Sequence, residues 1–443
     1  MAPRTFFIKT FGCQMNEHDS QKIGGLLANL GFEPTTQPET ADLVLFNTCT
    51  VRQKAHQKAF SEIGRAIAFK NSEPRTSNLE PRLIGVCGCV AQDQGAKLIS
   101  RFQGLDLVFG PDQIYRLPEL LEILQKTKKP VLATELINSA EDYHFLDDVA
   151  ATKLSGPSAY VTIMKGCNSR CSYCIVPKVR GTEVYRTARE IIKEIEFLVE
   201  KGCREVTLLG QNVNSYPDFS KLIRLISENT NVERIRFTSP HPKDVKDDLI
   251  EEYATNPKLC SHIHLPVQSG SDTVLKRMRR AYNRRTYLKK VESLKKARPG
   301  LGITTDVIVG FPQESDEEFN QTLLFLKEVQ FDNIFAFKYS PREATEAYSM
   351  EDDVPMTLKE ERLAKVLELQ NAISKKINQH YVGGTQEVLV ERNDRMATRR
   401  WMGRTSCHKI VNFTGKKTSI GDIVRVEVTK ANSNSLEGNL YGT

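Results

Sequence analysis

Short apolar runs alternate with polar, helix-like stretches along most of the chain. In residues 1–125 the runs are Phe6–Ile8, Leu43–Phe46, Leu83–Val86 and Leu105–Phe109. Strands that alternate with helices in this way are typical of βαβ units, which build a parallel sheet covered by helices. We therefore expect an α/β domain of the flavodoxin or Rossmann type over residues 1–125, and a linker over 126–157, where the pattern fades.

The same rhythm resumes over residues 158–376 with more repeats. Helical stretches such as Arg189–Lys201 and Glu317–Val329 separate the apolar runs. About six βα units without a break favour a partial (β/α)6 barrel, and a doubly wound sheet is the competing interpretation. The candidate strands are Ala159–Met164, Glu205–Leu209, Arg234–Phe237, His262–Pro266, Thr304–Val309 and Asn333–Phe337.

The pattern changes near the carboxyl end. Thr357-Leu-Lys-Glu360 resembles a capping box that opens a helix. After Gly383-Gly384 the apolar period becomes two, as in Glu387–Glu391 and Asp422–Glu427. Short strands separated by frequent turns predict a small β-barrel over residues 377–443. The apolar stripe of the preceding helix is Leu363, Val366, Leu367, Ile373 and Ile377.

Charge adds one asymmetry to this picture. The chain has 62 basic and 55 acidic residues, for a formal net charge of +7. Residues 377–443 hold 10 Lys or Arg and 6 Asp or Glu, so this short segment carries more than half of the net charge. A basic module suits an anionic partner such as nucleic acid, and a solvated charged surface explains the same count equally well.

The chain shows neither a secretory leader nor an apolar run of membrane-spanning length, so we expect a cytoplasmic protein without membrane contact. In a reducing compartment its 10 cysteines are not expected to form disulfides. Their spacing then has to be explained by metal binding, catalysis or burial. Cys203, Cys260 and Cys407 have no metal-type neighbours in sequence and are interpreted as ordinary buried residues.

Three cysteines lie on one loop in the middle of the chain. Cys167, Cys171 and Cys174 have C-x-x-x-C-x-x-C spacing and follow the first strand of the predicted barrel. Thiolates are the usual ligands of iron–sulfur clusters, and three of them leave one iron of a four-iron cluster open. An open iron can bind the amino and carboxyl groups of S-adenosylmethionine, whose reductive cleavage yields a 5′-deoxyadenosyl radical. The alternatives are a zinc site, which lacks a nearby fourth ligand, or unrelated buried cysteines.

The other cysteines of interest follow three different strands of the first domain. Cys13, Cys49 and Cys89 each end an apolar run, and Cys87 lies beside the last of them. Parallel strands place their carboxyl ends on one edge of the sheet, so three distant cysteines are expected to meet there. Spacing does not decide between Cys87 and Cys89. We choose Cys89 because a glycine precedes it, as one precedes Cys13.

These motifs resemble the radical S-adenosylmethionine methylthiotransferase family, and the resemblance spans nearly the whole chain. Gly12-Cys13-Gln-Met-Asn16-Glu together with Cys49-Thr-Val-Arg52 is similar to the MiaB subgroup, which acts on isopentenylated adenosine next to the tRNA anticodon. One stretch departs from the family, because Glu-Ala-Thr-Glu follows Ser340-Pro341-Arg342 where Pro-Gly-Thr-Pro is frequent. The remaining matches are Asn47-Thr48-Cys49, Gly88-Cys89-Val-Ala91, the central cysteine loop and Asp306-Val-Ile-Val-Gly310-Phe-Pro312.

The resemblance implies domains of three kinds: an amino-terminal cluster domain, a central radical domain and a carboxyl-terminal TRAM domain that binds RNA. It also implies two [4Fe-4S] clusters, one on the central loop and one on Cys13, Cys49 and Cys89. S-adenosylmethionine would be both the methyl donor and the radical source, and a methylthio group would replace hydrogen at carbon 2 of the adenine. The implied partners are the anticodon stem-loop of tRNA and an electron donor such as flavodoxin or ferredoxin, with the enzyme acting as a monomer.

Further residues receive roles from the same resemblance. Tyr173 matches the aromatic position before the last cysteine of the loop, and packing alone would also explain an aromatic residue there. Gln211, Ser239, Gln268 and Asp306 fall at predicted strand ends and are similar to positions that line the S-adenosylmethionine pocket. As polar residues at strand ends they need no such role.

Two basic stretches are candidates for tRNA contact. The first is Lys276–Arg280 with Arg284 and Arg285, for which a solvated helix face is the alternative. In the last domain the candidates combine basic charge with an aromatic ring, which RNA-binding surfaces often do, although the ring may equally belong to the core. They are Arg399, Arg400, Trp401, Arg404 and Lys409.

Two other functions fit the same motifs. The chemistry can be retained with another substrate, either threonylcarbamoyl-adenosine in tRNA or an aspartate of a ribosomal protein. A non-catalytic iron–sulfur protein that binds RNA and senses redox state is the alternative of another class. It predicts no turnover of S-adenosylmethionine under reducing conditions.

Overall fold

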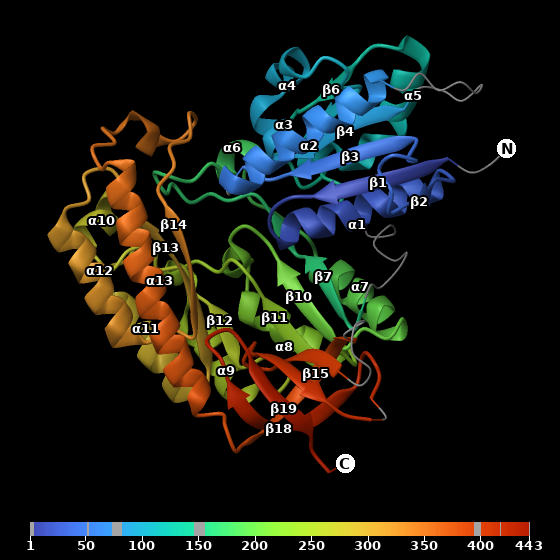
Figure 1. Cartoon of the computed structure of the whole chain (residues 1–443). Helices are drawn as coiled ribbons and strands as arrows, with labels where there is room; N and C mark the ends of the chain where they lie inside the picture. The colour runs from blue at the N-terminus through green and yellow to red at the C-terminus, as the bar shows by residue number, and fades with distance from the viewer. Residues whose placement is uncertain are drawn as a thin grey trace. The chain divides into compact units, whose positions relative to one another are not determined.

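The computed structural model describes residues 4–50, 53–72, 82–145, 156–393, 400–416 and 418–442 (Figure 1). The chain forms two compact units that exchange short segments. The first unit comprises residues 1–152, 164–169 and 175–186. The second comprises residues 153–163, 170–174 and 187–443.

The first unit is built on a six-stranded sheet in the order β2-β1-β3-β4-β5-β6, and all pairings are parallel. The predicted parallel sheet is therefore confirmed. Its last strand lies inside the segment that was expected to be a linker. The strands are β1 (Thr5–Thr10), β2 (Glu33–Pro34), β3 (Leu43–Thr48), β4 (Leu83–Gly88), β5 (Leu107–Phe109) and β6 (Val131–Ala133).

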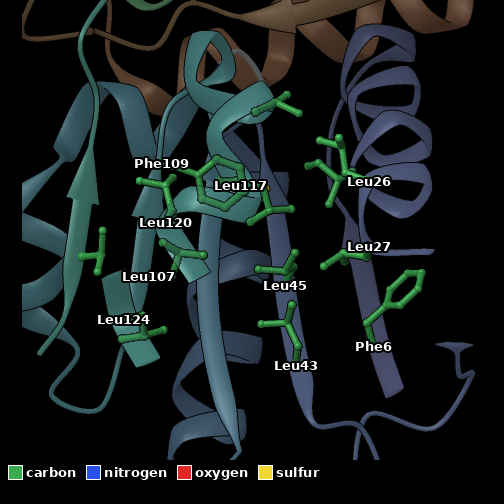
Figure 2. Close-up of a cluster of buried hydrophobic side chains, with 14 of the residues drawn as sticks. Phe6, Leu26, Leu27, Leu43, Leu45, Leu107, Phe109, Leu117, Leu120 and Leu124 are labelled. Carbon is green, nitrogen blue, oxygen red and sulfur yellow. The ribbon is translucent and has the colours of Figure 1, made fainter. Parts of the chain in front are cut away.

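Helices cover both faces of this sheet and bury a separate apolar cluster on each side. On one face, Leu43 and Leu45 of β3 lie toward Leu27 of α1, and Leu107 of β5 lies beside Leu120 of the α5 segment, as Figure 2 shows. Each such side chain contributes about 1.5–3 kcal/mol when fully buried. The helices are α1 (Gln14–Asn29), α2 (Gln53–Ser72), α3 (Cys89–Gln94), α4 (Ala96–Arg101) and α5 (Leu117–Thr127), with a 3-10 turn, η1, at Pro111–Arg116.

The second unit contains the six parallel strands predicted for the barrel. They form two three-stranded sheets, β11-β10-β7 and β12-β13-β14, and a bridge between Ile235 and Leu259 links β11 to the approach to β12. The strands follow chain order, so the partial barrel is confirmed and the doubly wound sheet is not. The strands are β7 (Ser158–Thr162), β10 (Glu205–Leu209), β11 (Arg234–Phe237), β12 (His262–His264), β13 (Gly302–Val309) and β14 (Asn333–Lys338).

Amphipathic helices cover the outer side of these strands. The helix α7 begins with a capping box in which the Thr187 and Glu190 side chains and backbones bond reciprocally, so its start follows from local sequence. The helices are α7 (Ala188–Glu200), α8 (Phe219–Asn229), α9 (Asp247–Thr255), α10 (Asp272–Arg277), α11 (Arg284–Ala297) and α12 (Asp316–Val329), with 3-10 turns η2 (Val213–Ser215), η3 (Pro242–Asp244) and η4 (Glu346–Ser349).

The helix α13 (Met356–Gln379) matches the predicted helix, but the predicted capping box is wrong. The helix begins after Pro355, its N-cap residue, and has no side-chain cap bond because proline carries no side-chain hydrogen-bond acceptor. Its buried face is also more polar than the predicted stripe. Arg362 and Gln370 are buried on it, whereas Leu367 is exposed.

The carboxyl-terminal segment closes into a barrel of five strands in the order β15-β16-β17-β19-β18, as the period of two predicts. Valine and phenylalanine side chains fill its interior, among them Val388, Val411, Phe413 and Val426. The strands are β15 (Thr385–Asn393), β16 (Arg400–Thr405), β17 (Ile410–Thr414), β18 (Ile423–Ala431) and β19 (Leu436–Leu440).

The turn between β16 and β17 is the part of the small barrel that docks on the six-stranded barrel. The Arg236 side chain donates hydrogen bonds to the carbonyls of Thr405, at 2.8 Å, and Ser406, at 3.0 Å. The Lys409 ammonium lies 2.6 Å from an Asp332 carboxylate oxygen. These contacts fall at the amino-terminal ends of β11 and β14, so the turn lies against the end of the barrel opposite the cysteine loop.

Candidate functional site

Cys13, Cys49 and Cys89 follow three neighbouring parallel strands. Cys13 precedes the first residue of α1, Cys49 comes directly after β3, and Cys89 opens α3 directly after β4. Because β3 lies between β1 and β4, the three carboxyl ends share one edge of the sheet. The topological prediction for these cysteines is therefore met.

The side chains themselves are also close. A hydrogen bond with Cys49 is the main reason that the pKa of Cys13 falls to about 6. Burial raises the pKa of Cys89, and the charge of Cys13 raises it further. Cys87 instead packs among the apolar side chains between the sheet and α1, where burial raises its pKa well above the ordinary value. The structure thus brings Cys89, rather than Cys87, toward the other two thiols.

Two buried asparagines tie these strand ends together. The Asn16 amide donates to Asn47 Oδ1 at 2.8 Å and to the carbonyl of Thr48 at 3.1 Å. The Asn47 amide returns a bond of 2.8 Å to the carbonyl of Asn16. Both side chains are 0% exposed, so each amide needs hydrogen-bond partners within the protein. Both asparagines belong to the sequence motifs, but the pattern gave no signal for this role.

An arginine outside the predicted set also reaches the first cysteine group. Arg180 ends the short helix α6 (Val176–Arg180), and its Nε donates to the Cys89 sulfur at 3.4 Å. Its Nη2 lies 2.7 Å from an Asp19 carboxylate oxygen. Arg180 and Asp19 are both buried. Sequence pattern gave no signal for this contact, because Arg180 and Cys89 are 91 residues apart.

Within the central loop, Cys167 is held by the first unit. Its backbone N–H donates to the carbonyl of Gly181 at 3.1 Å, beside the hairpin of β8 (Met164–Lys165) and β9 (Val184–Tyr185). Gly166 has φ +78°, and a Cβ atom there would lie 1.9 Å from the carbonyl oxygen of Thr182. Lys165 forms a buried ion pair of 2.7 Å with Asp112. The position of Cys167 therefore depends on a glycine and on a buried charge pair.

Cys171 and Cys174 are held by the second unit. The backbone N–H of Cys174 donates to the carbonyl of Cys171 at 3.0 Å, which closes a tight turn around Ser172 and Tyr173. Tyr173 packs edge-on against Phe311, with ring centroids 6.5 Å apart, and burial raises the pKa of its hydroxyl. Tyr173 thus packs against the core, which is the alternative role given for it in the sequence. Its role beside a cluster stays a prediction.

Arg280 approaches Cys171 much as Arg180 approaches Cys89. Its Nη1 lies 3.3 Å from the Cys171 sulfur, its Nη2 donates to the carbonyl of Pro266 at 3.0 Å, and its Nε donates to the Tyr282 hydroxyl at 2.8 Å. Arg280 is therefore engaged beside Cys171, but it also lines an open cavity at the start of α11, so its contact with tRNA phosphates stays a prediction. Arg277 is also engaged, since it forms a paired contact with Glu318 at 2.7 Å.

The remaining members of that basic stretch stay on the surface. Lys276 and Arg285 are exposed, and Lys276 lines an open cavity of about 650 Å³ with Lys243 and Lys290. Lys290 donates to three backbone carbonyls, of Pro242, Lys243 and Val245. The cavity therefore carries several cations at the amino-terminal end of α11.

Three of the four predicted S-adenosylmethionine residues follow their strands as expected. Gln211 comes after β10, Ser239 after β11 and Gln268 after β12. Ser239 and Gln268 have left-handed backbones, with φ of 59° and 70°, a strain that is typical of binding sites. Asp306 does not lie at a strand end as predicted. It lies inside β13, where its carboxylate is 3.4 Å from His264 Nε2.

The basic residues predicted for RNA contact in the last domain divide into three groups. Arg399 lies outside the described residues, as does Arg52 of the Cys49-Thr-Val-Arg52 motif in the first domain. Lys409 is buried against Asp332, which removes it from an RNA-facing surface. Arg400 is exposed, Trp401 is half-buried with its indole N–H bonded to the carbonyl of Gly415, and Arg404 lies 3.1 Å from Glu391.

Among the described residues, no group of three or more His, Cys, Asp or Glu side chains could hold a single metal ion. An iron–sulfur cluster imposes a weaker demand, because its own atoms separate the ligand sulfurs. The donor chemistry fits such a cluster. Cys13, Cys49 and Cys89 present only thiols, with a guanidinium group directed at one of them.

Three family models match successive parts of the chain. They are the Uncharacterized protein family UPF0004 over residues 5–110, the Radical SAM superfamily over 161–326 and the TRAM domain over 379–441. Curated relatives extend the similarity to almost the full length. The tRNA-2-methylthio-N(6)-dimethylallyladenosine synthase of Clostridium tetani is 43% identical over 443 residues, which cover 98% of this chain and 96% of the relative.

The chain belongs to this family of synthases. Another member, from Syntrophobacter fumaroxidans, is 44% identical over 447 residues, which cover 99% of this chain and 96% of the relative. The chain is thus a radical S-adenosylmethionine enzyme, and an iron–sulfur cluster and S-adenosylmethionine are its cofactors.

Two solved structures have a similar fold to this chain, although their sequences are little related to it. The radical S-adenosylmethionine methyltransferase TsrM from Kitasatospora setae matches with a TM-score of 0.57 at 13% identity, over 87% of this chain and 81% of that one. The radical enzyme OxsB matches with a TM-score of 0.52 at 12% identity, over 83% of this chain and 56% of that one. At these identities the likeness describes the fold alone.

Proposed function

We propose that this enzyme is a tRNA methylthiotransferase that inserts sulfur and a methyl group at carbon 2 of N6-isopentenyladenosine next to the anticodon. The near full-length similarity to synthases named for this product carries the proposal. The two groups of three cysteines add independent chemical support, because each offers three thiols to a cluster. We propose 1–125, 158–376 and 377–443 as the domains, with 126–157 between the first two.

We propose two [4Fe-4S] clusters, one held by Cys167, Cys171 and Cys174 and one by Cys13, Cys49 and Cys89. When bound, the clusters and S-adenosylmethionine supply the radical chemistry and the transferred groups. The low pKa of Cys13, about 6, favours the thiolate that iron binding requires. The positive charges of Arg180 and Arg280 offset negative charge on Cys89 and Cys171.

The protein's own task is to orient the reactants and exclude water. Tyr173, Phe311 and Tyr339 form an apolar wall beside the loop cysteines, together with Ile308 of β13. We propose that Gln211, Ser239, Gln268 and Asp306 bind S-adenosylmethionine over this wall. The left-handed backbones of Ser239 and Gln268 support a binding role, since such strain persists where surrounding structure fixes it for function.

We propose that tRNA phosphates bind in the basic cavity formed by Lys243, Lys276 and Lys290, in addition to the small β-barrel. Each phosphate contact releases counterions, so binding weakens with salt by a slope of about 0.7–0.9 per contact. The variants Lys243→Gln and Lys276→Gln are expected to reduce this slope for the anticodon stem-loop, whereas Lys221→Gln on α8 is the matched control. An unchanged slope in both cavity variants would remove the cavity from the RNA site.

The function is tested by anaerobic reconstitution with iron and sulfide, followed by reaction with dithionite, S-adenosylmethionine and isopentenylated anticodon stem-loop RNA. Mass spectrometry of the digested nucleosides is expected to detect a methylthio adduct of isopentenyladenosine. Formation of deoxyadenosine without the adduct would contradict the substrate. The same assay with threonylcarbamoyl-adenosine RNA or a ribosomal protein would then identify it.

We also propose that the enzyme works as a cytoplasmic monomer reduced by a flavodoxin or ferredoxin. All ten cysteines are free thiols, which fits a reducing compartment. Among the described residues, no helix combines the length and apolarity needed to cross a bilayer. Sedimentation of the reconstituted protein tests the monomer, and a sedimenting mass of twice the chain mass would contradict it.

A further inference from the structure

Arg180 is a cation in an environment that disfavours charge. Only 4% of its surface is exposed, and Asp19 beside it is 8% exposed. A buried guanidinium is costly unless it is paired and hydrogen-bonded, and Asp19 supplies a bond of 2.7 Å. This ion pair engages Nη2 of the guanidinium and not its Nε–H.

That Nε–H points at a sulfur. The Cys89 Sγ lies 3.4 Å from it, while Nη2 of the same guanidinium holds Asp19 at 2.7 Å. The influence of Arg180 also extends to a second cysteine. The pKa of Cys13 is lowered mainly by the hydrogen bond from Cys49, and the charge of Arg180 adds to that lowering. Arg180 therefore donates a hydrogen bond to one cysteine of the group, and the Asp19 carboxylate partly offsets its positive charge.

Hydrogen bonds to the ligand sulfurs and nearby charge are among the factors that set the reduction potential of an iron–sulfur cluster. A donated N–H and a positive charge stabilise the reduced form, which carries one more electron. A nearby carboxylate has the opposite effect. Arg180 and Asp19 should therefore shift the potential in opposite directions.

We propose that Arg180 is a positioning residue that sets the reduction potential of the cluster on Cys13, Cys49 and Cys89, and that Asp19 orients its guanidinium and moderates its charge. The inference rests on the proposed function, because it needs a cluster on this group of cysteines. In this proposal α6, which ends at Arg180, positions a charged side chain in addition to connecting the central loop to the following strand.

The test is a redox titration followed by electron paramagnetic resonance. The full-length chain carries Cys167→Ala, Cys171→Ala and Cys174→Ala, so that the remaining signal comes from one group of cysteines. Arg180→Gln is expected to lower the midpoint potential, with at least a tenfold change in the reduction equilibrium, about 59 mV for one electron. Asp19→Asn is expected to raise the potential, and Arg180→Lys, which retains charge without the directed N–H, to lower it less than Arg180→Gln.

Arg116→Gln is the matched control, because Arg116 lies on the surface of the same unit and pairs with Glu119 at 2.7 Å. Its potential should equal that of the parent protein. Unchanged potentials, or shifts of the same sign in the Arg180 and Asp19 variants, would overturn the inference. Loss of iron from all three variants would also overturn it, because that result would assign the pair a role in folding alone.

One further variant separates this inference from the proposed function. Cys89→Ala in the same background is expected to lose the remaining iron. If the iron stays bound, the ligand set of the proposed function is wrong and the cause lies there. A second outcome is that Cys89→Ala loses the iron while the Arg180 and Asp19 variants keep the midpoint potential of the parent. In that case the proposed ligands are supported and the proposed role of Arg180 is wrong.

Discussion

The two groups of cysteines are built in opposite ways. Cys13, Cys49 and Cys89 come from three strands, and buried amides and an ion pair join those strands. Cys167, Cys171 and Cys174 come from one loop, whose two ends pack with different units of the chain. The first group therefore depends on the fold of a whole sheet, whereas the second depends on the local turns of one loop.

The cations beside the two groups differ in the same sense. Arg180 is neutralised by Asp19 at 2.7 Å, whereas the recorded hydrogen bonds of Arg280, within the described residues, go to Cys171, Tyr282 and Pro266, none of them a carboxylate. A cation without a carboxylate partner acts more strongly on nearby thiolates than a neutralised one does. Each group has three thiols, but the cation beside the Cys13 group is paired with a carboxylate and, in the part of the chain that the structure describes, the cation beside the loop group is not.

The largest effect is expected at the glycine that precedes Cys89. Gly88 has φ +87°, and a Cβ atom there would lie 2.4 Å from Asn47 Oδ1 and 2.6 Å from the carbonyl oxygen of Thr48. Gly88→Ala should cost about 3–5 kcal/mol in free energy of unfolding, the sum of a left-handed backbone and an overpacked core. Urea denaturation measures this cost, and iron analysis should show loss of the sheet-built site.

Gly31→Ala is its control. Gly31 has φ +80° with nothing within 4 Å of its Cβ direction, so only the backbone cost of about 1–2 kcal/mol should remain. Equal losses in the two variants would mean that the strand ends are not packed as tightly as the comparison requires.

Arg280→Gln should affect the loop-built site and spare the other. It removes a charged donor from Cys171, a contact of about 1.5–3 kcal/mol, so deoxyadenosine formation should fall about tenfold to a hundredfold. Iron bound by the Cys13 group should be unchanged. Arg279→Gln, at an exposed residue paired with Glu346, should retain parental activity. Parallel losses in both variants would point to general destabilisation.

The thiols of the first group should differ in reactivity with pH in the iron-free protein. The pKa of Cys13 is lowered from 9.0 to about 6, whereas burial raises that of Cys89. A depressed pKa favours the thiolate, so alkylation of Cys13 by iodoacetamide should rise through about pH 6 and level off by pH 8. Cys89 should react slowly over this range. Peptide mass spectrometry follows each residue, and a common pH profile would refute the difference.

The smallest effect is expected within the loop itself. The Ser172 hydroxyl donates to the carbonyl of Arg277 at 2.8 Å, so Ser172→Ala should cost about 1 kcal/mol. The Ser169 hydroxyl, in the same loop, is buried without a hydrogen-bond partner in the described part of the chain, and Ser169→Ala should be neutral in thermal unfolding. A cost at Ser169 larger than at Ser172 would contradict the role of the Ser172 hydroxyl in holding the loop.

The sequence predicted these sites unevenly, for physical reasons. The positions of Cys13, Cys49 and Cys89 follow from strand topology, which apolar period alone reveals. The small β-barrel followed from its period of two in the same way. Asp306 was assigned to a strand end although the predicted strand Thr304–Val309 already ran past it, as β13 does.

The pattern of apolar and polar residues does not predict contacts between side chains that are far apart in the sequence. Arg280 lies in a basic stretch that resembles an RNA-binding surface, but the turn after α10 directs it at Cys171, 109 residues away. Lys409 was assigned to RNA for the same reason, and its partner Asp332 comes from another domain of the sequence. Charge composition counts such residues, whereas only the folded chain decides which of them remain available to a ligand.

The turn between β16 and β17 has a consequence for how this enzyme can be dissected. Arg234 and Arg236 are buried, and carbonyls of Arg404, Thr405 and Ser406 accept their hydrogen bonds. Removing residues 377–443 would leave both guanidiniums without these acceptors at the floor of the catalytic barrel. A shortened enzyme would then lose activity through damage to the barrel, whether or not RNA affinity is lost. The proposed RNA-binding role of the last domain is therefore tested separately only by exchanging side chains on its outer face, such as Arg400, while the turn is kept intact.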